Sequence, residues 1–132
     1  MLEFQLNVIV LKIMGEYMFY TYIIRCEDNT LYTGITTDPK RRFREHFSKS
    51  KECAKYTFRH GAVKMEALWS SPDRSSASRL EYQIKKLTKI CKEALINEPE
   101  NLSLYFEEKI KDEYKTELEI VKKINKSNIV KL

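Results

Sequence analysis

The alternation of apolar and polar side chains predicts short strands in the first half of the chain. Residues 2–10 alternate with a period of two, which is typical of a strand with one buried face. Residues 19–26 are dense in aromatic and β-branched side chains, and the turn at 27–29 leads to a hairpin partner at 30–34. Residues 62–70 predict the last strand. We therefore expect a small three-stranded antiparallel sheet formed by residues 19–70.

The segments between and after these strands show helical spacing and helix-start signals. Asp38 and Pro39 form a typical helix start, and that helix should run to about residue 47. Residues 48–61 are polar and basic and are expected to be a loop. A further helix should begin with Ser75 or Ser76 as its cap, and a short helix should end near residue 96. The helix that begins at Ser75 or Ser76 should bury an apolar stripe at helical spacing, formed by Ala77, Leu80, Ile84 and Leu87.

The last third of the chain predicts one amphipathic helix. Residues 97–100 (Asn-Glu-Pro-Glu) look like a helix-capping box with an early proline. An apolar stripe follows, formed by Ile110, Tyr114, Leu118 and Val121, and it must be covered by the domain, a second copy or a protein partner. The predicted fold class is thus α+β, with a sheet flanked by helices and an added C-terminal helix.

The chain divides into a central domain with two extensions. Residues 1–18 are either an added edge strand or an overextended start, with Met18 as the true beginning. Residues 19–97 form the predicted domain, and residues 98–132 form the helical extension. A length of 132 residues with 42% hydrophobic and 33% charged residues fits a single soluble domain.

Cysteine usage and hydropathy indicate the cytoplasm. No apolar stretch is long enough to span a membrane, and residues 2–14 lack the features of a signal peptide. Three widely spaced cysteines without a C-x-x-C pattern argue against a zinc site or a disulfide framework.

The net charge of +5 is concentrated in the predicted central domain. Residues 19–97 hold 16 lysines and arginines against 9 acidic residues, which is typical of a surface that binds a phosphate backbone. The alternative is a solvated lysine-rich surface. The candidate phosphate-binding residues are Arg41, Arg44, Lys49, Lys51, Lys55, Lys85 and Lys86.

Five further residues could form one polar site for phosphodiester hydrolysis: Tyr22, Tyr32, Arg42, His46 and Glu81. Arg42 and His46 are one helical turn apart, so they share a face. Arg42 can neutralise a phosphate oxygen, and His46 can orient water, transfer a proton or serve structure alone. Glu81 could hold Mg²⁺ or Mn²⁺ with water and phosphate as the other ligands, or it could simply pair with Lys85.

The sequence motifs around these five residues together resemble those of the GIY-YIG endonuclease superfamily. The match lies in Tyr20-Thr21-Tyr22, Tyr32-Thr33-Gly34, Arg42-x-x-x-His46 and Glu81, in this order and spacing. It is most similar to the stand-alone single-domain branch and to the catalytic domain of structure-specific nucleases that cut branched DNA. Tyr20-Thr21 stands where many members have Gly-Ile, Thr33 replaces an isoleucine, and Ile35 lies where some relatives have a lysine.

The resemblance implies a metal-dependent DNA endonuclease with structure preference and little sequence specificity, acting in repair, recombination or processing. One motif tyrosine would be the general base and the other would shape the site, and the sequence does not say which. A tyrosine base needs its pKa lowered from about 10, which a metal and Arg42 could do. Gly34 would allow close backbone approach. The sequence does not distinguish DNA from RNA, and the alternative function is a nucleic-acid-binding module with little or no cleavage.

Overall fold

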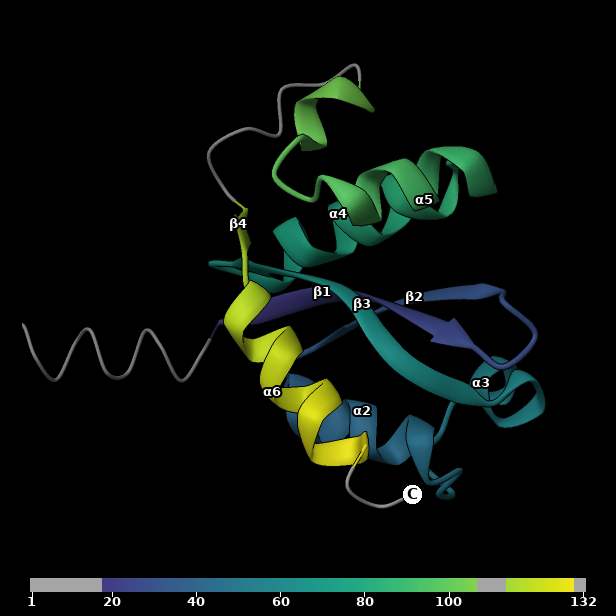
Figure 1. Cartoon of the computed structure of the whole chain (residues 1–132). Coiled ribbons are helices and arrows are strands. Elements are labelled where there is room, and N and C mark those ends of the chain that lie inside the picture. The colour runs from purple at the N-terminus through teal and green to yellow at the C-terminus, as the bar shows by residue number, and fades with distance from the viewer. Residues whose placement is uncertain (1–17, 107–113, 130–132) are drawn as a thin grey trace, which may run out of the picture.

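The computed structural model describes residues 18–106 and 114–129, which form an α+β domain around one antiparallel sheet (Figure 1). The three expected strands are present, but the sheet has a fourth, two-residue strand at one edge, so the expectation of three strands was too low. The strand order is β2-β1-β3-β4, with β1 at Phe19–Cys26, β2 at Leu31–Thr36, β3 at Ala62–Ser71 and β4 at Lys115–Thr116. The strand expected at residues 2–10 lies outside the described residues.

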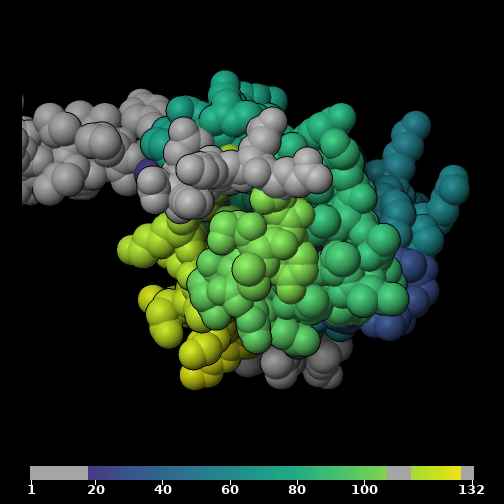
Figure 2. Space-filling model, turned by 90° about the horizontal axis from the view of Figure 1, so that it is seen from above, coloured from purple at the N-terminus to yellow at the C-terminus, as the bar shows by residue number. Residues whose placement is uncertain are grey.

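Helices cover both faces of the sheet (Figure 1). One face carries α4 and α5, and the opposite face carries α2 and α6. The face with α5 and the turn after it is seen from above in Figure 2. The helices are α2 (Pro39–Phe47), α3 (Lys55–His60), α4 (Arg74–Lys85), α5 (Lys89–Asn97) and α6 (Leu118–Ile129), with a 3₁₀ turn at Leu102–Leu104.

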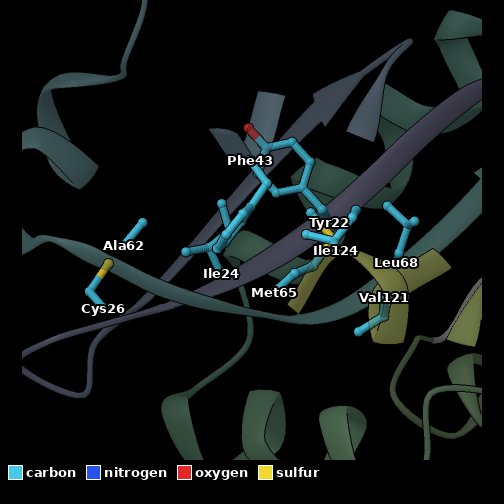
Figure 3. Packing of buried hydrophobic residues seen from close by; sticks show 9 residues of the cluster. All are labelled: Tyr22, Ile24, Cys26, Phe43, Ala62, Met65, Leu68, Val121 and Ile124. Atoms are coloured by element: carbon cyan, nitrogen blue, oxygen red, sulfur yellow. The ribbon is translucent and has the colours of Figure 1, made fainter. Parts of the chain in front are cut away.

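The period-two pattern of β1 builds two cores, one on each side of the sheet. Tyr22 and Ile24 point to the side of α2 and α6, where Phe43 and Ile124 join them (Figure 3). Ile23 points to the other side, where it packs with residues of α4 and α5 around Trp69. Successive residues of one strand therefore serve different helix layers.

Two acidic side chains begin the helices that follow β2 and β3. The Asp38 carboxylate accepts a hydrogen bond from the Arg41 N–H at 3.1 Å, as the sequence predicts. The cap of α4 is Asp73, which accepts from the Ser76 N–H at 2.7 Å, so the expectation of Ser75 or Ser76 was wrong. A carboxylate at the cap also interacts favourably with the positive end of the helix dipole.

The predicted loop at residues 48–61 contains the short helix α3, which corrects that expectation. The Ala54 carbonyl accepts a hydrogen bond from the Phe58 N–H at 3.0 Å, and the buried Thr57 holds the helix against α2. Gly61 ends the helix at a φ of 74°, a conformation that favours glycine.

The C-terminal helix begins at Leu118, about twenty residues later than the capping box at 97–100 predicts. Asn97 ends α5 instead, and the carbonyl of Pro99 accepts a hydrogen bond from the Trp69 indole at 2.8 Å. Tyr114 packs in the Trp69 core while Val121 packs in the Tyr22 core, on the opposite side of the sheet. The two residues therefore cannot belong to one helical stripe, although their spacing fits one. Ile110 lies outside the described residues.

Helix α6 is covered by the domain itself, through Val121 and Ile124. Its Asn125 side chain also bonds the edge of β3, where Oδ1 accepts from the Met65 N–H and Nδ2 donates to the Met65 carbonyl, both at 2.9 Å. The Asn125 amide thus satisfies the backbone groups of Met65 at the edge of β3, where β4 is too short to pair.

All three cysteines are free. Over residues 18–106 and 114–129, the structure has no helix that is both long enough and apolar enough to cross a membrane.

Candidate active site

The first two strands bring the motif residues together. Their antiparallel register places Tyr22 directly opposite Gly34, and Tyr32 lies two residues earlier on the same face of β2. The ring centroids of Tyr22 and Tyr32 are 6.3 Å apart. A Cβ atom at position 34 would lie 2.6 Å from Cζ of Tyr22, which is closer than atoms can approach. Gly34 is therefore required because the Tyr22 ring occupies the space of its missing side chain.

Tyr22 is the start of a buried hydrogen-bond chain through α2 and α3. Its hydroxyl lies 2.8 Å from Nε2 of His46, and Nδ1 of His46 lies 2.6 Å from the hydroxyl of Thr57. All three side chains are almost completely buried. The Thr57 hydroxyl also lies within hydrogen-bond distance of the Ala54 carbonyl, to which it can donate. Cys53 Sγ lies 2.9 Å from the Thr57 hydroxyl oxygen.

The partners of Thr57 assign the proton of the His46 ring. A hydroxyl has one hydrogen, and Thr57 can donate it to the Ala54 carbonyl at 3.2 Å, a group that can only accept. The Thr57 oxygen is then an acceptor for Nδ1–H, and this leaves the Nε2 lone pair to accept the hydrogen bond that the Tyr22 hydroxyl donates. We assign this tautomer from the bonding pattern.

Burial keeps both partners of that bond neutral. Burial, followed by the charge of Arg42, lowers the pKa of His46 to about 4. Burial first, then Tyr32, raises the pKa of the Tyr22 phenol well above its usual value, although the hydrogen bond and charge of Arg42 act in the opposite direction. A free tyrosinate is therefore disfavoured in the protein itself, contrary to the lowered pKa that a tyrosine base requires.

Arg42 lies beside Tyr22 at the start of a hollow that opens next to β2. Its guanidinium donates to Glu45 Oε1 at 3.0 Å and to the carbonyl of Glu52 at 2.6 Å. Burial alone would lower the pKa of Arg42, but these contacts with Glu45 and Tyr22 outweigh burial and raise it. The hollow is lined by Phe19, Ile35, Thr36, Thr37, Arg41, Arg42, Glu45, Glu52 and Arg74.

Glu81 belongs to the opposite helix layer. It lies on α4, a helix in contact with β1 and β2, and its charge contributes to the raised pKa of Tyr22. Its side chain is 24% exposed and its carboxylate pairs with Lys85 at 3.3 Å, which is the structural role that the sequence also allowed.

The donor set fits a divalent ion that keeps most of its water. Within residues 18–106 and 114–129, no group of three His, Cys, Asp or Glu side chains could hold a metal. Mg²⁺ commonly binds through one or two carboxylates plus water and substrate phosphate, so the single half-buried Glu81 is sufficient. Its Lys85 partner is exposed and can move aside.

The candidate phosphate-binding residues fall on separate surfaces. Arg41 and Arg44 are exposed on α2, whereas Lys85 is the last residue of α4. Lys86 follows as its C-cap, and the Lys86 ammonium lies 4.8 Å from the centroid of the Tyr82 ring. The remaining three, Lys49, Lys51 and Lys55, line a hollow beside α3.

The sequence reading missed the contribution of α3. Thr57 orients His46, and the Tyr56 ring stacks on Tyr32 with a centroid separation of 5.7 Å. The signal that could have revealed this was the pair of aromatic residues, Tyr56 and Phe58, in a segment that otherwise looks like a polar loop.

Comparisons with known proteins agree with this geometry. The family model described as the GIY-YIG catalytic domain matches residues 18–97. The chain is similar to the UPF0213 protein FN1575 of Fusobacterium nucleatum, with 42% identity over 83 residues, which are 63% of this chain and 81% of the relative. It is also similar to the UPF0213 protein YhbQ of Salmonella typhimurium, with 46% identity over 82 residues, which are 62% and 80% of the two chains.

One solved structure is also similar in sequence, the solution NMR structure of the UPF0213 protein BH0048 from Bacillus halodurans. It is 37% identical, with a TM-score of 0.41, over 65% of this chain and 89% of that one. Because the family model covers more than half of the residues and includes both tyrosine motifs, the chain belongs to the GIY-YIG family, in its stand-alone single-domain branch.

Proposed function

We propose that this protein is a divalent-metal-dependent endonuclease that hydrolyses phosphodiester bonds in DNA. The observation that carries the proposal is the buried hydrogen bond from Tyr22 to His46, with Arg42 and Glu81 as the charged groups that act on the same tyrosine. The chemistry is assigned to residues 19–97, with structural support from 98–132, in the cytoplasm, where the three thiols stay reduced.

A relay through Tyr22 explains how a tyrosine with a raised pKa can act as a base. As the attacking water gives a proton to the Tyr22 oxygen, the hydroxyl proton of Tyr22 moves to Nε2 of His46. No free tyrosinate forms, but the proton ends on a His46 ring whose pKa of about 4 makes it a weak base, so the relay depends on a metal at Glu81 that would acidify the attacking water. The Nδ1–H group of His46 stays hydrogen-bonded to the Thr57 oxygen throughout, and this bond holds the ring in place.

The remaining charges act on the phosphate. The guanidinium of Arg42 would neutralise a non-bridging oxygen, an interaction that is strongest in a site with little water. A metal ion held by Glu81 would supply further charge neutralisation and acidify a water. Tyr32, packed between the His46 and Tyr56 rings, positions its neighbours instead of exchanging protons.

The decisive variant is Glu81→Gln, which keeps the shape of the side chain and removes its charge. Cleavage of duplex, flap and branched DNA in Mg²⁺ or Mn²⁺ should fall by at least about 10²-fold, while DNA affinity measured by fluorescence anisotropy stays the same. The matched control is Glu119→Gln, which removes another helical Glu–Lys pair, that with Lys122 on α6, and should cut normally.

The Glu81–Lys85 ion pair is the observation that favours the second candidate, a binding module without cleavage. A parent protein that binds DNA but cuts none of the substrates with either metal would establish that alternative. If Glu81→Gln cut at the parental rate, the metal assignment would be wrong.

A further inference from the structure

The segment after α2, together with α3, surrounds a second hollow of about 610 Å³. It is lined by Lys49, Ser50, Lys51, Cys53, Lys55, Phe58 and Arg59, and every charged residue among these is basic. Its volume lies within the range of about 300–1,000 Å³ that small-molecule sites occupy.

The positive charges of this hollow are uncompensated. Across the described residues, neither its three lysines nor Arg59 has a carboxylate partner, whereas Arg25, Lys64 and Lys89 are each paired with a glutamate. Unpaired cations that converge on one hollow form a site of positive potential, and the anion that fits it is a phosphate chain.

Phe58 gives the hollow an aromatic surface. Its side chain is 57% exposed, although burial would be the usual place for a phenylalanine, and the Lys49 ammonium lies 5.9 Å from its ring centroid. An exposed ring among lysines is the arrangement that binds single-stranded nucleic acid, because any unpaired base can stack on it while the cations hold the backbone. A duplex offers no free base face for such a ring.

The backbone at Lys49 has the left-handed conformation of a residue that ends a helix. Its φ is 55°, in the left-handed region just beyond the end of α2, where glycine is the favoured residue. A lysine at this position costs stability, yet it places a cation beside the Phe58 ring.

The hollow adjoins the active site through α3. Cys53 lines the hollow and contacts Thr57, which holds His46, and Tyr56 of the same helix stacks on Tyr32. We propose that the hollow binds an unpaired nucleotide of the DNA substrate, with Phe58 stacked on the base and the lysines on the flanking phosphates. This inference rests on the proposed function and specifies a substrate with a single-stranded segment next to the cut.

Binding without divalent ions tests the inference separately from cleavage. With labelled oligothymidine in EDTA, Phe58→Ala should weaken affinity by about 5- to 150-fold, the loss expected for one stacking partner. Its affinity for a duplex of equal length should stay unchanged, and Phe58→Trp should bind oligothymidine like the parent. The control is Leu104→Ala, another exposed apolar side chain, which should alter neither.

The variant Lys49→Gly provides a second test, in which stability and single-strand affinity should not fall together. Glycine relieves the backbone strain, so the melting temperature should stay the same or rise, while the affinity for oligothymidine should fall. Equal losses on single strands and duplex for Phe58→Ala, or unchanged single-strand binding, would overturn the inference. Phe58-dependent binding in a protein that never cuts would instead refute the proposed function and leave this site standing.

Discussion

At the scale of residues, the chain Tyr22–His46–Thr57 decides where protons lie. Its members come from β1, α2 and α3, and each uses its bonding capacity on the next. Burial of such a chain is costly unless every group is satisfied, and among the described residues no buried side-chain nitrogen or oxygen lacks a partner.

The lowered pKa of His46 predicts that the protein loses stability in mild acid. The unfolded chain takes up a proton as the pH falls below about 6.5, but the folded protein does so only near a pKa of about 4. His46 therefore stabilises the fold fully above pH 6.5. Between these values the free energy of unfolding should fall by up to about 1.4 kcal/mol per pH unit, measured by urea unfolding at a series of pH values.

Replacement of the two histidines identifies the source of that slope. His46→Gln should flatten it, whereas His60→Gln should keep it, since His60 contacts Asp28 at the surface. Hydrogen bonds from Thr30 and then His60 lower the pKa of Asp28 to about 2, so the contribution of this carboxylate is lost at lower pH. A parent protein with no slope between pH 6.5 and 4 would contradict the pKa of His46.

The site residues could be predicted from the sequence only as far as local spacing reaches. Arg42 and His46 share a helix, so their common location follows from the spacing of four. Thr57 could not be assigned to His46, because the two residues are eleven positions apart and lie on different helices. The raised pKa of Tyr22 was also out of reach, because it arises from burial beneath α2 and α6.

At the scale of elements, short segments are the ones that local patterns misjudge. The six residues of α3 are fewer than the window of about 11–18 residues over which helical periodicity can be recognised. By contrast, Asp38-Pro39 carries its own start signal, and α2 begins where the sequence predicts. The spacing of Tyr114 and Val121 fits a helix, yet β4 carries the chain from one face of the sheet to the other between them.

The bond of α6 to the edge of β3 predicts a specific stability change. Asn125→Asp keeps the acceptor for the Met65 N–H but replaces the donor to its carbonyl with a negative oxygen. The free energy of unfolding, from chemical denaturation, should fall by about 1–3 kcal/mol.

The neighbouring Asn128→Asp is the control for this measurement. It introduces the same charge near the end of α6, but its Nδ2 donates only to the Ile124 carbonyl of its own helix. Both variants carry the cost of a negative charge near a helix C-terminus, so the difference between them reports the strand-edge bond. Equal destabilisation of the two would show that Asn125 adds nothing to the sheet.

At the scale of the whole molecule, the hydrophobic core extends past the family match. The match ends at residue 97, but Leu102 and Phe106 complete the Trp69 core, and Val121 and Ile124 complete the core that contains Tyr22. Chemistry and stability therefore draw on different lengths of chain.

Removal of all residues after Asn97 should leave the candidate catalytic side chains present but the protein largely unfolded near room temperature. Loss of each large buried side chain costs about 2–5 kcal/mol, and a domain of this kind has about 5–15 kcal/mol in total. Thermal unfolding followed by circular dichroism measures this directly.

The milder variant Ile124→Ala separates stability from chemistry. It should lower the free energy of unfolding by about 2–5 kcal/mol and still cut DNA with the same metal and pH optimum at low temperature. A truncated chain that melts like the full-length protein would show that residues 98–132 are independent of the core.

The contact between Tyr22 and Gly34 also has an evolutionary consequence. Position 34 is closed to side chains by the ring across the strand pair, and its own backbone conformation makes no demand for glycine. Substitution of Gly34 is therefore tolerated only after Tyr22 has been replaced by a smaller residue. A lineage that lost the tyrosine first would free position 34 to accept alanine or serine, whereas the reverse order would pass through a clash. Among homologues, variation at position 34 should thus be confined to chains that have already replaced Tyr22.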